Sequence, residues 1–220
     1  MSELYQIYWK DEQLDNLYPF AIPYKNEILT PFFENSVICE VVPKSKADKI
    51  GVCSHALRQK IGGGIPMRKE FTEEDIESDY EVLCLGRSDQ TQRMIWRLDH
   101  WHPGAAAILY RIFEKLGKQK PGEPRDPIYQ NHFLAQRQIY LDYLSELLIP
   151  SMYLMQHDEE ISHLVSVDSN YFKLKPPYSE FAQRCEKFFG KKDYCPLHAF
   201  ICERLFSIWM TTKPIKVKYI

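Results

Sequence analysis

The chain has 220 residues, of which 45% are hydrophobic and 26% are charged, and its formal net charge is -2. This length and composition predict one folded domain over residues 1–220, because a disordered chain carries fewer apolar residues and a larger net charge. The basic residues are scattered along the sequence, which excludes nucleic acid as an expected partner, since binding to a phosphate backbone requires a sustained positive surface.

The first half of the chain alternates between segments with the period of a strand and segments with the period of a helix. In chain order we expect a strand at 4–9, a helix at 33–42, strands at 49–54 and 80–86, and helices at 88–98 and 104–116. Pro43 would close the first of these helices, and Gly117 would end the last one. Ser88 or Asp89 is the expected N-cap of the helix that runs toward Leu98.

The second half of the chain is richer in helical periodicity. We expect a strand at 129–135, followed by a helix from 139 that continues past Pro150 with a kink. A long loop is expected at 157–177, then helices at 179–189 and 197–210 and a strand at 215–220. The whole order predicts a three-layer α/β fold, in which helices flank a mostly parallel mixed sheet. Ligands of such sheets bind at the carboxyl ends of the strands.

Basic residues and glycines follow the strand expected at 49–54. His55, Arg58 and Lys60 come directly after it, and the run Gly62, Gly63 and Gly64 comes next. Cations next to a glycine-rich loop can hold phosphate, because glycine lets backbone amides approach the ligand closely. Three glycines alone are a weak signal, so the loop is a candidate phosphate site by position rather than by motif.

Asp99, His100 and His102 form the densest group of acidic and imidazole side chains in the chain. On a helix, residues three apart share a face, so Asp99 and His102 are expected to converge while His100 points elsewhere. Such a pair could supply a general base for an acceptor hydroxyl or could ligate a metal. The alternative is a packed corner around Trp101 and Pro103 in which the histidines have no chemical role.

Two further polar pairs stand in apolar surroundings. Asn131 and His132 sit at an expected strand, where they could contact substrate or simply face solvent. Glu203 and Arg204 lie in the apolar helix at 197–210, where buried charges need partners, so a structural ion pair is favoured over a substrate-binding role.

Four blocks of the sequence, taken in order, resemble the glycosyltransferase-like proteins of capsular polysaccharide synthesis in bacteria. The blocks are ENSVICEVVPKSKADKIGVCSHALRQK, YEVLCLGR, NHFLAQRQIYLDYLSELLIPSMYLM and LHAFICERLFSIWM. The resemblance implies a GT-A-like fold, a nucleotide-sugar donor, and a site that includes His55 and Arg58 and lies close to Asn131 and His132. The sequence has no clear DxD pair, with which many such enzymes hold Mn²⁺ or Mg²⁺, so metal dependence stays open.

The resemblance leads to a hypothesis of sugar transfer from a nucleotide sugar to a surface glycan or a lipid-linked acceptor, with peripheral membrane association for a lipid-linked one. Arg58 and Lys60 would neutralise the leaving phosphate, His55 would line the donor pocket, and Asp99 or His102 would be the base. Two rivals stay open. One is a non-catalytic nucleotide- or carbohydrate-binding member of the fold, and the other is a metal-dependent hydrolase built on Asp99, His100 and His102.

No apolar run in the sequence approaches the roughly 20 residues that a membrane-spanning helix needs. The amino-terminal residues MSELYQIYWKDEQ also lack the order of charged, apolar and small residues that marks a signal peptide. From both observations we expect a cytoplasmic protein without a transmembrane segment.

Overall fold

The computed structural model describes residues 1–60, 71–85, 93–124, 128, 131–174 and 180–220, with the side chains of residues 59, 60 and 174 outside the description. The described residues form one six-stranded sheet in the order β2-β1-β3-β5-β4-β6. The strands are β1 Ser2–Tyr8, β2 Ile22–Lys25, β3 Lys49–Ser54, β4 Val82–Cys84, β5 Phe133–Gln136 and β6 Val217–Tyr219.

The sheet is mixed, and β5 is the strand that runs against its neighbours. The pairs β1–β2, β1–β3 and β4–β6 are parallel, whereas β5 pairs antiparallel with both β3 and β4. The carboxyl ends of the other five strands and the start of β5 therefore lie at one edge of the sheet, which we call the carboxyl edge. The expected α/β fold with a mostly parallel mixed sheet flanked by helices is confirmed.

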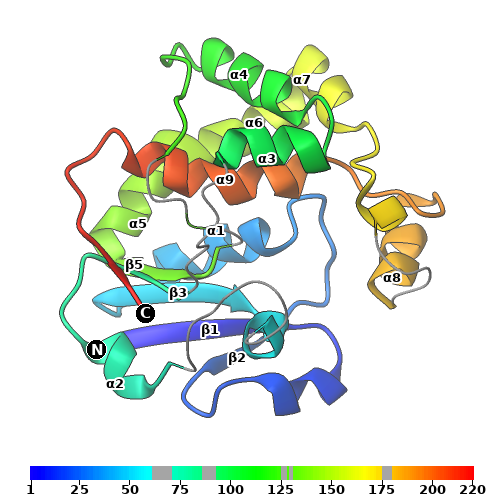
Figure 1. Ribbon diagram of the computed structural model, residues 1–220. Coiled ribbons are helices and arrows are strands. Elements are labelled where there is room, and N and C mark those ends of the chain that lie inside the picture. Colours follow the sequence, from blue (N-terminus) through cyan, green and yellow to red (C-terminus); the bar gives the residue numbers. More distant parts are fainter. Residues whose placement is uncertain (61–70, 86–92, 125–127, 129–130, 175–179) are drawn as a thin grey trace.

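The two faces of the sheet carry separate hydrophobic clusters, because side chains alternate between faces along each strand. In β4, for example, Val82 and Cys84 belong to the larger cluster and Leu83 to the smaller one; in β5, Ala135 belongs to the larger and Leu134 to the smaller. Figure 1 shows that most of the helices gather over the face that carries the larger cluster, while α2 lies on the other side of the sheet.

The α-helices other than α2 build the thick layer on the larger cluster. They are α1 Glu34–Lys44, α3 Met94–Trp101, α4 Ala105–Lys115, α5 Arg137–Tyr143, α6 Ile149–His157, α7 Glu159–Val165, α8 Glu180–Phe189 and α9 His198–Met210. The smaller cluster is covered by short elements, namely the 3-10 helices η1 Asp11–Asn16 and η2 His55–Lys60 and the helix α2 Glu73–Glu77. A further 3-10 helix, η4, spans Tyr171–Leu174.

The kink expected near Pro150 is a π-helical turn. Residues Leu144–Leu148 (η3) form this turn between α5 and α6, and Pro150 sits in the first turn of α6. A proline in a continuing helix lacks the N–H that would bond to the preceding turn, and a π-turn accommodates that missing bond.

Three expectations for individual elements are wrong. The long loop expected at 157–177 contains α7, whose first amides are capped by Asp158: its Oδ1 accepts a hydrogen bond of 3.0 Å from the amide of Ile161. Helix α3 begins at Met94, so neither Ser88 nor Asp89 is its N-cap. Both residues lie outside the described residues. Pro43 lies within α1 instead of closing it, since the helix continues to Lys44.

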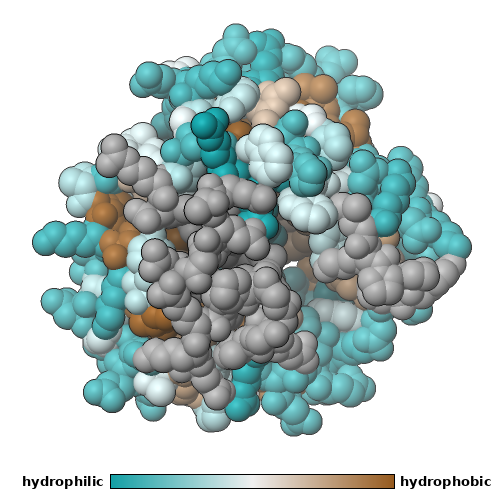
Figure 2. All heavy atoms as spheres, viewed as in Figure 1, coloured by the Kyte–Doolittle hydropathy of each residue, from teal (hydrophilic) through white to brown (hydrophobic). Residues whose placement is uncertain are grey.

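The described helices include none that is both long and apolar enough to span a bilayer. On the face of the molecule seen in Figure 2, the described side chains are mostly hydrophilic, and apolar residues are scattered among them.

Candidate functional site

Asn131 and His132 lie at the carboxyl edge, directly before β5, and both are buried. Asn131 adopts a left-handed backbone conformation (φ 52°), and its Nδ2 donates to Oδ1 of Asn35 in α1 over 3.4 Å. The carbonyl of Asn131 accepts from Sγ of Cys53 at 3.5 Å, and the carbonyl of His132 accepts from the amide of Leu85 at 2.9 Å. The pair therefore joins β3, β4 and α1 at this edge and does not face solvent.

His55 and Arg58 lie in η2, just after β3, on the side of the sheet that carries the smaller cluster. Arg58 is exposed, and its guanidinium carbon lies 5.7 Å from the ring centroid of Tyr18. The side chain of Lys60 and the glycines Gly62 and Gly63 lie outside the described residues. The structure thus places the basic segment next to the carboxyl edge, on the side opposite the thick helical layer.

His102 lies on the other side of the sheet, buried against α9. Its ring stacks on Phe200 with 4.0 Å between centroids, and its Nδ1 lies 2.9 Å from the carbonyl oxygen of Ser169. Burial lowers the pKa of His102. Two nearby charges have smaller effects: Arg204 lowers this pKa and Glu203 raises it. His102 is therefore neutral at pH 7 and lies within the field of the charged pair on α9.

Glu203 and Arg204 form the ion pair that the sequence predicted, with Nη1 of Arg204 3.0 Å from Oε2 of Glu203. Both side chains are largely buried. Tyr171 of η4 also belongs to this group. Its ring packs against Phe200 with 5.1 Å between centroids. Burial, and to a lesser extent the charge of Glu203, raises the pKa of Tyr171. We call His102, Tyr171, Glu203 and Arg204 the α9 polar cluster.

The α9 polar cluster borders the carboxyl edge through the start of α1. Glu34, the first residue of α1, is close enough to raise the pKa of Tyr171 and also that of Tyr140, although burial is the main cause in both cases. The next residue, Asn35, holds Asn131 at the carboxyl edge. These contacts link the α9 polar cluster, through the start of α1, to Asn131 at the carboxyl edge, whereas Arg58 lies on the other side of the sheet.

Asp99 and His100 make contacts of their own. Oδ1 of Asp99 accepts hydrogen bonds from the amides of Gly104 at 3.1 Å and Ala106 at 3.2 Å, so it caps the start of α4. His100 is exposed and stacks on Trp96 with 4.9 Å between ring centroids. The expected convergence of Asp99 and His102 is therefore absent from these contacts, while His100 does point elsewhere.

Metal-ligand geometry bears on the hydrolase hypothesis. Within the described part of the chain, no group of three or more histidine, cysteine, aspartate or glutamate side chains is arranged to hold a metal ion. Asp99, His100 and His102 have three separate sets of neighbours: the α4 amides, Trp96 and Phe200. These three residues do not form a metal site.

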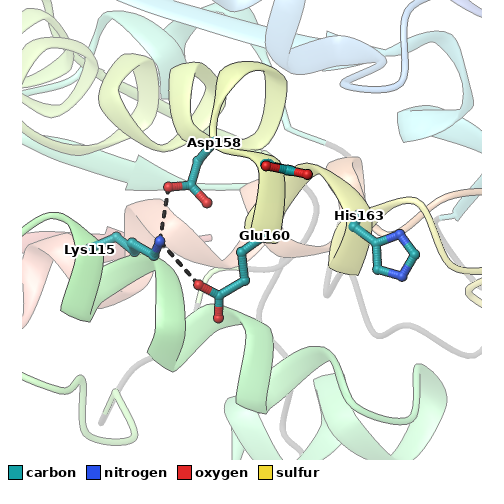
Figure 3. Close-up of a pocket in the computed structure, with 5 residues that line it drawn as sticks. Lys115, Asp158, Glu160 and His163 are labelled. Atoms are coloured by element: carbon teal, nitrogen blue, oxygen red, sulfur yellow. Dashed lines mark hydrogen bonds and ion pairs between the residues drawn. The ribbon is translucent and has the colours of Figure 1, made fainter.

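A surface hollow of about 560 Å³ between α4 and α7 has a structural explanation. Figure 3 shows the Lys115 amino group directed at Asp158 and Glu160, and both Nζ–oxygen distances are 3.0 Å. Hydrogen bonds to Lys115 and Arg111 lower the pKa of Glu160 to about 2, with those to Arg111 the larger cause. These ion pairs connect α4 with α7. The hollow is lined by none of the predicted site residues.

Sequence reasoning missed Tyr171, Glu34 and His198 as members of this region. His198 starts α9, packs edge-on to Phe32 at 5.2 Å, and has an Nδ1 without a hydrogen-bond partner among the described residues. Glu34 and His198 lie within blocks of the family resemblance, but no chemical pattern singles them out there, and Tyr171 lies outside the blocks. An N-terminal acidic residue on an expected helix and an aromatic residue in an expected loop are too common to single out.

Comparisons of this chain with protein-family models, with curated proteins and with solved structures find no significant match. Its function is therefore inferred from its own residues and from the resemblance of its sequence blocks.

Proposed function

We propose that this chain is a glycosyltransferase of GT-A-like fold that moves a sugar from a nucleotide-sugar donor to a surface glycan or a lipid-linked acceptor. The resemblance of four sequence blocks supports the reaction class, and the mixed sheet with its polar carboxyl edge is compatible with the fold. The observation that carries the mechanism is the environment of His102.

His102 has the protonation state that a general base requires. Its low pKa keeps the ring neutral, and a neutral imidazole whose Nδ1 faces a carbonyl oxygen must carry its proton there, so that Nδ1 donates to Ser169. Nε2 then holds a lone pair, and none of the described residues donates a hydrogen bond to it. This is the tautomer that can accept the proton of an attacking hydroxyl.

Of the two candidate bases, His102 fits the role better than Asp99. Oδ1 of Asp99 accepts hydrogen bonds from the amides of Gly104 and Ala106, so this oxygen is already engaged at the start of α4. In the proposed reaction the acceptor oxygen forms a bond to the anomeric carbon while its proton passes to Nε2 of His102. The bond from that carbon to the diphosphate breaks, and cationic side chains beside the diphosphate stabilise the negative charge that develops on it.

The test compares His102→Asn with His100→Asn in the full chain. The asparagine amide can keep the hydrogen bond to Ser169 but cannot act as a base, so turnover should fall by roughly 10²–10⁴-fold while donor binding is retained. His100 is exposed on the same helix and is the matched control, whose turnover should equal that of the unaltered protein. Thermal unfolding of both variants verifies that they fold.

Release of nucleoside diphosphate from nucleotide sugars, with and without Mn²⁺, is the readout. Turnover that is unchanged in His102→Asn would contradict the role of His102. Donor binding without turnover in the unaltered protein would contradict transfer and favour the binding-module alternative. Ester hydrolysis that a chelator abolishes would favour the hydrolase instead.

A further inference from the structure

Arg184 of α8 lies at the carboxyl edge, although nothing in its local sequence marks it. Its guanidinium carbon is 5.1 Å from the ring centroid of Trp9, the residue after β1, and its Nη2 donates a hydrogen bond of 2.7 Å to the carbonyl of Asn26, the residue after β2. In Figure 1, α8 stands beyond the end of the sheet toward which the arrowhead of β3 points. Ligands of open α/β sheets bind at this edge.

Among the described residues, two lysines near Arg184 form ion pairs, whereas Arg184 forms none. Lys10 forms an ion pair with Glu180, and Lys25 forms one with Asp11 at 2.8 Å. No carboxylate of the described residues lies within ion-pair distance of Arg184. Partial burial lowers the pKa of its guanidinium, and the only opposing influence is the Cys185 thiol. An arginine stays protonated in proteins, so this group is a partly desolvated cation for which the described residues supply no anion.

The described residues also use little of the hydrogen-bonding capacity of Arg184. A guanidinium has five N–H donors in a planar fork, and among the described residues only the carbonyl of Asn26 accepts from it. Such a fork matches the oxygen atoms of a phosphate, and the indole of Trp9 fixes the plane of the fork. We propose that Arg184, held against Trp9, binds a phosphate group of the sugar-nucleotide donor. This inference rests on the proposed function, since that function supplies the anion.

Helix α8 connects this position with the α9 polar cluster. Phe181 lies three residues before Arg184, and therefore on the same side of the helix. Its ring packs against Phe33 at 5.3 Å and against Tyr171 at 6.3 Å, and Tyr171 belongs to the α9 polar cluster. One helix thus contacts both the ends of β1 and β2, where the donor phosphate binds, and the group that contains the base His102.

The experiment measures binding of inorganic pyrophosphate and of a nucleoside diphosphate to the full chain by calorimetry. Arg184→Gln should weaken both by roughly 10- to 100-fold, because a charge-assisted, forked contact is lost. Arg184→Lys, which keeps the charge and loses the fork, should give a smaller loss. Arg137→Gln is the matched control: Arg137 donates to the carbonyls of Ser45 and Pro43 at the opposite edge of the sheet, and its loss should leave binding unchanged.

The outcomes separate this inference from the proposed function. Loss of binding in Arg184→Gln supports the inference, even if the unaltered protein transfers no sugar and the proposed function fails. If Arg184→Gln binds the probes as tightly as the unaltered protein does, the inference is overturned and the transferase proposal stands. Arg184→Lys is judged in the same way if the glutamine variant does not fold. No binding of either probe by the unaltered protein overturns the inference, and sugar transfer is then judged by turnover alone.

Discussion

The indole N–H of Trp209 donates a hydrogen bond of 2.8 Å to Oε2 of Glu146, and this bond ties the end of α9 to the π-helical turn. Glu146→Ala should lower the free energy of unfolding by about 1–3 kcal/mol, because the indole N–H of a side chain that is only 5% exposed loses its acceptor. Glu146→Gln keeps an oxygen for the indole and loses only the half-exposed ion pair with Lys213, so it should cost less than about 1 kcal/mol. Urea unfolding distinguishes the two, and equal losses would contradict the assigned bond.

Asp99 acts as the cap of α4, and its removal should affect stability more than chemistry. Asp99→Ala should lower the free energy of unfolding by about 1 kcal/mol, since the amides of Gly104 and Ala106 lose their acceptor. Asp99→Asn, which keeps one side-chain oxygen, should lose less. Turnover of the folded Asp99→Ala protein should stay near that of the unaltered chain, and a loss as large as that of His102→Asn would make Asp99 the base instead.

Gly51 in β3 leaves no room for a side chain. A Cβ atom at this position would lie 2.6 Å from Cγ of Leu134 and 3.0 Å from Cδ1 of Leu4. Gly51→Ala should therefore lower the free energy of unfolding by about 1–3 kcal/mol through overpacking. Combining it with Leu134→Ala should cost less than the sum of the two single substitutions, because the second change removes the clashing atoms. Strictly additive losses in a double-mutant cycle would show that Gly51 does not lie this close to the side chain of Leu134.

His198 makes the stability depend on pH. Burial lowers its pKa from 6.5 to about 4, so between these values the unfolded chain binds a proton that the folded chain excludes. The free energy of unfolding should therefore fall as the pH drops from 6.5 to about 4, with a slope from this residue of at most about 1.4 kcal/mol per pH unit. Burial lowers the pKa of His102 as well, so its contribution has the same sign.

His198→Phe removes the titrating group and keeps a ring against Phe32. Its stability should depend less steeply on pH than that of the unaltered protein within this window, and the two slopes should agree above pH 6.5. The matched control is His100→Asn, which replaces an exposed histidine. Chemical unfolding at a series of pH values measures all three, and an unchanged slope in His198→Phe would contradict the buried, neutral state.

Local periodicity was sufficient to predict most of the elements. The strand at 49–54 and the helix at 197–210 were expected within about a residue of β3 and α9, because a buried strand and an apolar helix carry their periods in the sequence itself. Helix α7 was missed, since it is short and its polar residues outnumber the apolar ones. Its burial against the core through Ile161 and Val165 could be seen only after folding.

In the candidate site, too, the sequence predicted one feature and left another undecided. Glu203 and Arg204 were recognised as an ion pair because adjacent opposite charges in an apolar helix need each other, which is a local requirement. The base could not be chosen between Asp99 and His102 from spacing, because the choice depends on which backbone groups each side chain meets.

By itself the sequence determined the types and order of most of the elements and the α/β class, since these follow from short-range periodicity and turn residues, whereas β2, α2 and α7 were not predicted. Tertiary structure alone decided that β5 runs against its neighbours, that Gly51 faces Leu134, and that Arg184 meets Trp9 at the carboxyl edge. The physical reason is that such contacts join residues far apart in the chain, where packing and strand pairing set the neighbours and no local pattern records them.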